Sequence, residues 1–167
     1  MKQPLSKTSK AQFIALGVGR EVFAVPVESV LEILDMQPVF RVPEMPAYML
    51  GLISLRGRSV PVLDLRTKLG LPSIPPTGTT RILLVDVRAS AQSLVLGLVV
   101  DRVMAALALG AEAIKAPPDA TMRWRSVYIQ DAGHRYERFA IIYFTKLFSA
   151  GEAIAAIIRS FGQDFNT

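Results

Sequence analysis

The sequence predicts a mostly-β protein, organised as barrels or a sandwich with short peripheral helices. Short apolar runs rich in β-branched residues recur along the chain, and turn signals containing Gly or Pro separate them, as in small β-barrels and sandwiches. The 167 residues, 51% of them hydrophobic, are enough to bury a sizeable core in one domain or in two small lobes. No internal repeat at a fixed period is visible.

The chain is expected to start with a flexible tail, residues 1–12, followed by a β-hairpin. Residues 13–18 alternate in polarity, and a glycine-containing turn leads into residues 22–25. After Pro26, apolar residues fall at helical spacing, so a short amphipathic helix is expected over residues 27–34.

Residues 52–55 and 60–63 predict a tight β-hairpin in the middle of the chain. Gly57 adopts a positive φ at little cost, so the chain can reverse there and leave Arg56 and Arg58 at an exposed tip. Binding residues are often carried on such rigidly mounted loops, although the pattern alone favours two ordinary solvated arginines.

The segments beside this hairpin are expected to be mostly irregular. Residues 38–46 contain three prolines and predict an extended connector or an edge strand. Residues 65–69 predict one helical turn that Gly70 ends. Residues 71–80, with three prolines and no periodicity, predict a mobile loop.

The second half of the chain is expected to be rich in strands. Residues 81–87 and 94–100 predict two apolar strands around a polar turn, and the second has too few polar residues to be wetted on one face. Gly97 within it indicates a bulge or close packing. Further strands are expected at residues 103–109, 124–129 and 139–144, and an amphipathic helix with Ile154, Ile157, Ile158 and Phe161 on one side is expected within residues 151–167.

The residues that catalysis or cofactor binding would need are largely missing. There is no cysteine, and the single histidine, His134, sits in an expected turn. The glycines match no phosphate-binding pattern, and no His, Asp or Glu cluster has the spacing of metal ligands. Asp64 and Asp101 each end an apolar run and are expected to cap a following helix or to pair with an arginine. The sequence therefore predicts no catalytic residue, no cofactor and no metal.

Hydropathy and charge limit the location and the partners. No apolar run approaches the ~20 residues that span a bilayer, and the basic N-terminus lacks the apolar segment of a signal peptide, which fits the cytoplasm. A net charge of +5 is typical of proteins that bind nucleic acid or acidic membranes, but the basic residues are dispersed along the chain. A basic β-barrel that grips nucleic acid near Arg123, Trp124 and Arg125 is kept as the alternative hypothesis.

Seven short segments, taken in order, resemble the CheW family, the coupling proteins of bacterial chemosensory arrays. They lie within residues 13–148, and although each alone is weak, the ordered series is specific. The segments are Phe23-Ala-Val-Pro-Val, Val30-Leu-Glu-Ile33, Val42-Pro-Glu-Met-Pro46, Gly51-Leu-Ile-Ser-Leu-Arg-Gly57, Val60-Pro-Val-Leu-Asp-Leu65, Gly97-Leu-Val-Val-Asp-Arg-Val103 and Ala116-Pro-Pro118.

The resemblance implies one domain over residues 13–150, made of two intertwined five-stranded SH3-like β-barrels that share a core. It implies no catalysis. A protein of this family is an adaptor that holds the cytoplasmic tip of a methyl-accepting chemoreceptor and the regulatory domain of a CheA-like histidine kinase. The expected location is therefore the cytoplasm, at membrane-bound receptor arrays, without nucleic acid and without direct membrane insertion.

The resemblance also assigns partner-binding residues by position. Arg56 matches the arginine of the family's Asn-Leu-Arg-Gly turn, and Val30 and Glu32 match its Val-x-Glu positions, which were expected on the first helix. The implied partner-binding set is Val30, Glu32, Gly51, Arg56, Gly57 and Arg58.

Two features qualify the role of Arg56. Its planar guanidinium suits a carboxylate or a row of carbonyls on a partner, but it also suits an intramolecular bridge to Glu32 or Glu28, and the two roles can coexist. Ser54 stands where the family usually has Asn, which removes one amide donor from the turn.

Overall fold

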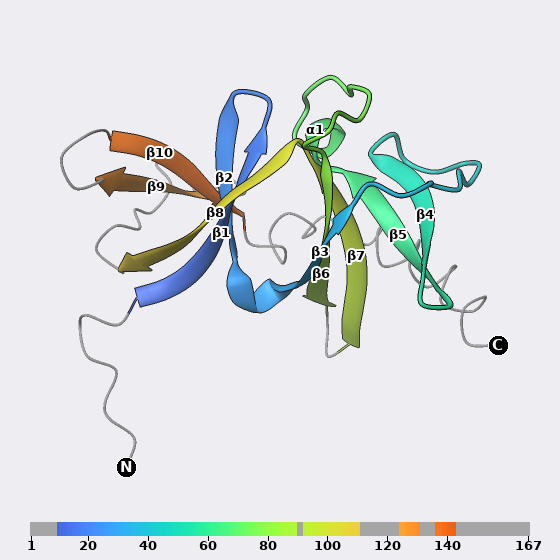
Figure 1. Cartoon of the computed structure of the whole chain (residues 1–167), viewed down its shortest axis with the longest axis horizontal. Coiled ribbons are helices and arrows are strands. Elements are labelled where there is room, and N and C mark those ends of the chain that lie inside the picture. Colours follow the sequence, from blue (N-terminus) through green and yellow to red (C-terminus); the bar gives the residue numbers. More distant parts are fainter. Residues whose placement is uncertain (1–9, 90–91, 111–123, 131–135, 143–167) are drawn as a thin grey trace, which may run out of the picture.

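The structure, a computed structural model, describes residues 10–89, 92–110, 124–130 and 136–142. Ten strands form two five-stranded sheets that lie side by side (Figure 1). Within these ranges the helical elements are a 3₁₀ turn at Val27–Ser29 and one short helix, α1, at Leu65–Lys68. The mostly-β prediction is confirmed, and the expected C-terminal helix of residues 151–167 and His134 lie outside the described residues.

Each sheet has a simple strand order. The first sheet runs β8-β1-β2-β10-β9, with β1 at Lys10–Val18, β2 at Glu21–Pro26, β8 at Arg102–Gly110, β9 at Trp124–Gln130 and β10 at Tyr136–Ile142. The second runs β3-β6-β7-β5-β4, with β3 at Val30–Asp35, β4 at Met49–Leu55, β5 at Arg58–Asp64, β6 at Arg81–Ala89 and β7 at Gln92–Val100.

The two sheets share one connectivity pattern. Each has an antiparallel hairpin, β1–β2 or β6–β7, with an antiparallel strand on one side, β8 or β3. On the other side of each hairpin lies a parallel strand, β10 or β5, that carries an antiparallel outer strand. Because β1 and β2 precede the whole second sheet and β8–β10 follow it, the first sheet is a circular permutation of the second, and the chain crosses between the sheets twice.

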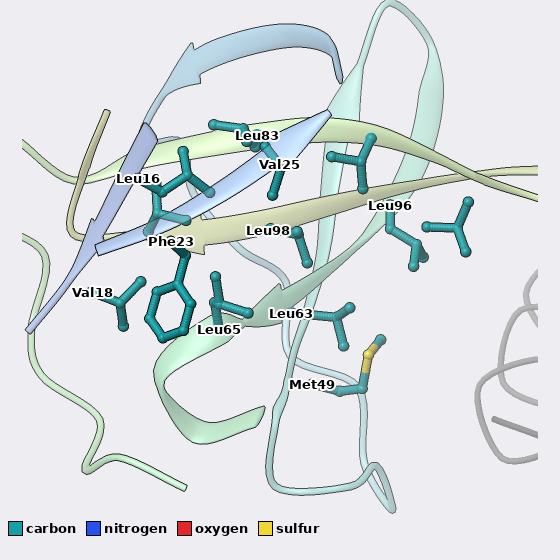
Figure 2. Packing of buried hydrophobic residues seen from close by; sticks show 13 residues of the cluster. Leu16, Val18, Phe23, Val25, Met49, Leu63, Leu65, Leu83, Leu96 and Leu98 are labelled. Atoms are coloured by element: carbon teal, nitrogen blue, oxygen red, sulfur yellow. The ribbon is translucent and has the colours of Figure 1, made fainter. Parts of the chain in front are cut away.

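Buried side chains form three clusters, one between the sheets and one on the far side of each. Along β6, Leu83 and Val85 face the cluster between the sheets, while Ile82 and Leu84 face the cluster of the second sheet. This alternation explains why β6 and β7 are apolar on both faces, since both faces are covered along most of their length, Val95 being an exposed exception on β7. Figure 2 shows the shared cluster, in which Leu16, Val18, Phe23 and Val25 of the first sheet meet Met49, Leu63, Leu83, Leu96 and Leu98 of the second sheet and Leu65 of α1.

Gly97 on β7 marks close packing. A Cβ at this position would lie 2.9 Å from Cγ2 of Ile82 and 3.1 Å from Cγ2 of Val62. The register of β7 with β5 and β6 runs without a shift through Gly97, so of the two expectations it is close packing that the structure confirms.

The helix expected over residues 27–34 is wrong. The chain forms the 3₁₀ turn and then strand β3, which pairs antiparallel with β6 from Val30 to Asp35. Val30 and Leu34 are four residues apart and therefore fit the period of a strand as well as that of a helix. Partly buried and exposed residues alternate along β3, and pairing with a strongly apolar neighbour decides between the two periods.

The other expected elements fall close to their predicted positions. The hairpins β1–β2, β4–β5, β6–β7 and β9–β10 are all formed, and α1 is followed by Gly70 at a φ of 83°. Residues 36–48 form an irregular connector, with one bridge from Phe40 to Leu52, and residues 71–80 form an irregular loop. Strand β1 begins at Lys10, earlier than the expected domain boundary at residue 13.

Candidate functional site

The tip of the β4–β5 hairpin is a two-residue turn made by Arg56 and Gly57. Leu55 pairs with Arg58, and the two turn residues have φ values of 48° and 77°. Positive φ at both central residues is the geometry whose twist matches the flanking strands. The expected positive φ of Gly57 is confirmed, and Arg56 also adopts one, which is uncommon for a residue with a side chain.

Arg56 is exposed but not free. Its Nη2 donates to Oε1 of Glu32 at 2.9 Å and to Oε2 at 3.0 Å, and the side chains of Arg56 and Glu32 are 71% and 34% exposed. β3 and β4 are the two outer strands of the second sheet, so this ion pair joins its opposite edges. The expected intramolecular bridge is thus formed with Glu32. At this exposure it contributes at most about 1 kcal/mol to stability, and its main effect is to orient the guanidinium.

The structure gathers only part of the predicted set at the surface. Gly57 and Arg58 are exposed beside Arg56, and Glu32 is half-buried beneath it. Val30 is half-buried and packs against the cluster between the sheets.

Gly51 is buried and supports the connector. A Cβ here would collide with the carbonyl of Phe40, and the φ of 141° is unfavourable for other residues. This close approach allows Phe40 and Leu52 to exchange backbone hydrogen bonds of 2.7 and 2.9 Å. Gly51 therefore shapes the strand that carries the tip.

Three exposed apolar residues near Glu32 escaped the sequence interpretation. Leu31 is 54% exposed, Ile33 43% and Val27 37%. The expected helix had placed Leu31 and Val27 on its buried stripe. The alternation along residues 30–35 is the signal that could have assigned Leu31 and Ile33 to an outward strand face. We call Leu31 and Ile33, together with Val27 of the preceding 3₁₀ turn, the β3 face.

A second polar cluster joins the two sheets. Asp101, just after β7, accepts hydrogen bonds from Arg66 Nε at 2.9 Å, from Arg66 Nη2 at 2.7 Å and from the N–H of Gly19 at 2.6 Å. The hydrogen bond from Arg66 is the main cause that lowers the pKa of Asp101, with smaller contributions from Gly19 and from the charges of Arg66 and Arg102, while burial opposes them. The same contact raises the pKa of Arg66.

The two strand-ending aspartates therefore play the roles expected of them. Asp64 caps α1, because its side chain accepts from the N–H of Arg66 at 3.2 Å and from the hydroxyl of Thr67 at 2.9 Å. Asp101 pairs with Arg66. Both carboxylates are used by the protein's own structure.

In the part of the chain that the structure describes, no group of three or more His, Cys, Asp or Glu side chains is placed to hold a metal ion. Over the same residues, no helix has the length and apolar character needed to cross a bilayer.

Comparison with known proteins assigns the family. A profile of the CheW-like domain matches residues 12–145 of the 167. The chain belongs to the CheW-like family. The resemblance inferred from the ordered segments is confirmed.

Individual CheW relatives agree with this assignment. The probable chemotaxis protein CheW of Rhizobium etli is 38% identical over 108 residues, which cover 65% of this chain and 67% of the relative. The chemotaxis protein CheW of Bacillus subtilis is 31% identical over 124 residues, which cover 74% and 76%. The crystal structure of the scaffolding protein TtCheW from Thermoanaerobacter tengcongensis matches with a TM-score of 0.72 at 23% identity, over 85% of this chain and 94% of that one, and supports the fold.

Neither these CheW comparisons nor the residues that the structure describes favour the nucleic-acid alternative; Arg123, on which that hypothesis partly rests, lies outside the described residues. Arg66, Arg81 and Arg102 each donate hydrogen bonds to carbonyl or carboxylate oxygens of their own chain. The positive charge is thus partly used internally.

Proposed function

We propose that this CheW-like chain is a chemotaxis coupling protein, a non-catalytic adaptor that joins the cytoplasmic tip of a methyl-accepting chemoreceptor to the regulatory domain of a CheA-like histidine kinase. The observation that carries the proposal is an exposed arginine on a rigid hairpin tip, whose ion pair with Glu32 places it beside β3, the strand that carries the exposed Leu31 and Ile33. Membership of the CheW-like family supports it.

The surface has the composition of a small protein interface. Specific interfaces combine a dry apolar centre with a rim of polar and charged groups. The β3 face supplies apolar side chains, while Arg56 and Arg58 supply charge. Because Glu32 already holds Arg56 in place, little side-chain freedom is lost when a partner carboxylate or carbonyl approaches the remaining guanidinium N–H groups.

A non-catalytic role fits the way in which the ionisable groups are used. The two groups whose charged forms the fold clearly favours, Asp101 and Arg66, are bonded to each other and hold the sheets together. An adaptor acts by binding its partners and needs no catalytic group. Weak individual contacts become effective when many receptors, couplers and kinases are held in one array at the membrane. We assign this function to the domain expected over residues 13–150, extended to Lys10 because strand β1 begins there.

The test is binding of the full chain to a purified CheA-type regulatory domain and to a receptor fragment that contains the cytoplasmic tip. Arg56→Glu is expected to weaken at least one of the two interactions. Arg20→Glu is the matched control, because Arg20 is also an exposed arginine in a hairpin turn and the charge change is the same. If neither partner binds at tens of micromolar, the adaptor proposal fails. If both arginine variants weaken binding equally, the effect is net charge and not the tip.

A further inference from the structure

A cleft of about 420 Å³ opens at the end of the β4–β5 hairpin that lies opposite to the tip. One wall comes from the connector of residues 36–48 and the start of β4, and the other from the loop of residues 71–80. Its apolar lining consists of Met36, Val39, Leu50, Ile74, Pro75, Pro76 and Val99. Leu50 and Arg56 are six residues apart on an extended strand, so the cleft and the tip are separated by about 20 Å.

The loop of residues 71–80 is held at both ends by Arg66 and Asp101, the two side-chain members of the polar cluster that joins the sheets. Nη1 of Arg66 donates to the carbonyl of Pro72 at 3.0 Å, and the hydroxyl of Thr79 donates to the carbonyl of Asp101 at 2.9 Å. Prolines within the loop further restrict its backbone. The cleft is therefore formed before anything binds, which lowers the entropic cost of binding.

The polar groups at the floor of the cleft are already satisfied. Asp64, Asp101 and Thr80 all accept hydrogen bonds from neighbouring residues. Among the residues that the structure describes, no buried side-chain nitrogen or oxygen lacks a partner. These polar groups therefore do not need a hydrogen bond from a ligand, and the apolar residues of the lining remain available for contact.

Arg41 provides the one unpaired charge at this cleft. It lines the cleft and is exposed, and within the described ranges its guanidinium forms no hydrogen bond or ion pair. Residues 72–79 are all exposed, so the cleft is open along this side. An open cleft lets a chain pass through it, whereas a small molecule would be only partly enclosed.

We propose that this cleft binds an extended peptide segment of a partner protein, with an aliphatic side chain seated between Ile74 and Val39 and a neighbouring carboxylate paired with Arg41. Charge complementarity to Arg41 and the apolar part of the lining define this occupant. The cleft is a second contact surface, separate from the hairpin tip, and goes beyond the proposed coupling through Arg56.

The probes are two tetrapeptides, acetyl-Ala-Leu-Glu-Ala-amide and the neutral acetyl-Ala-Leu-Gln-Ala-amide, titrated into the full ¹⁵N-labelled chain. Saturable shifts of backbone amides are expected at Val39, Ile74 and Val99 with both peptides. Arg41→Gln should weaken binding of the Glu peptide about two- to five-fold, as for an exposed ion pair, and leave the Gln peptide unchanged. Arg58→Gln, an exposed arginine at the hairpin tip, is the matched control and should change neither.

Ile74→Asp should remove binding of both peptides without unfolding the protein, because Ile74 lies on an irregular loop and is 43% exposed. The proposal is overturned if no saturable shift appears at millimolar peptide, if the shifts gather at residues 55–58, or if Arg41→Gln weakens both peptides equally. None of these outcomes bears on binding of the receptor or kinase domain at Arg56, and loss of that binding would leave the peptide titration unchanged.

Discussion

Replacement of Asp101 by Asn tests whether one carboxylate holds the two sheets in register. Asp101 accepts three hydrogen bonds from the Arg66 guanidinium, of 2.7 to 3.0 Å, and one from the N–H of Gly19, and its side chain is 17% exposed. Asn keeps the shape of the side chain and one oxygen acceptor, but it removes the negative charge that pairs with the Arg66 guanidinium. Charge-assisted hydrogen bonds contribute about 1.5–3 kcal/mol each, and part of this is retained, so we expect the free energy of unfolding to fall by about 2–3 kcal/mol.

The loss should also depend on pH. In the folded protein the pKa of Asp101 lies below its ordinary value of 3.8, so the carboxylate stabilises the fold fully above that value. This stabilisation is lost as the pH falls from about 3.8 through the folded pKa. The difference between wild type and Asp101→Asn should therefore be constant near neutral pH and shrink below the ordinary pKa of aspartate.

Urea denaturation followed by circular dichroism, from neutral to acid pH, measures both effects. Asp35→Asn is the control, because Asp35 pairs with Arg81 at 3.4 Å with its side chain 89% exposed, and its loss should cost less than about 1 kcal/mol. A cost for Asp101→Asn no larger than for Asp35→Asn would refute the reasoning. So would a difference that stays constant down to the acid limit of the fold.

Three further predictions follow from the same structure. Gly51→Ala should lower the free energy of unfolding by about 2 kcal/mol or more, because the new Cβ meets the Phe40 carbonyl and the φ of 141° is unfavourable for alanine. Gly57→Ala, which has open space around it, should cost only about 1 kcal/mol. Urea denaturation measures both, and equal costs would contradict the close approach at Gly51. Gly97→Val should cost about 1–3 kcal/mol by overpacking against Ile82 and Val62, and an unchanged thermal midpoint would contradict this. Arg56→Ala should change the free energy of unfolding by no more than about 1 kcal/mol, and a larger loss would give the ion pair a structural role that its exposure does not support.

Most strands and turns were predictable because local patterns and tertiary structure agree. Residues 81–87 and 94–100 were both expected to form apolar strands, and the second run was expected to have too few polar residues for a wetted face. The structure explains this through clusters on both sides of the sheet. The helix expected at residues 27–34 failed because its apolar spacing fits two periods. The choice depends on β6, a strand that lies far along the chain, and no local pattern contains that information.

The candidate site was predictable in part. The exposed turn at Arg56 was expected, and a bridge to Glu32 or Glu28 was considered. The bridge to Glu32 forms although Glu32 lies on a strand and not on a helix. The burial of Gly51 under Phe40 was not foreseeable, because it depends on how an irregular connector folds back. The shared connectivity of the two sheets also left no trace as a repeat, since equivalent strands occur in a permuted order along the chain.

The double crossing between the sheets has a consequence for synthesis. Strands β3–β7 of the second sheet are contiguous in the chain. Strands β1 and β2 are synthesised before them, but their neighbours in the first sheet, β8 and β10, are synthesised only after them. Such distant pairings are slow to form. We expect the second sheet, which is contiguous in the nascent chain, to fold first. The β1–β2 hairpin would then pack against the apolar face of that sheet until β8, β9 and β10 are synthesised and complete the first sheet.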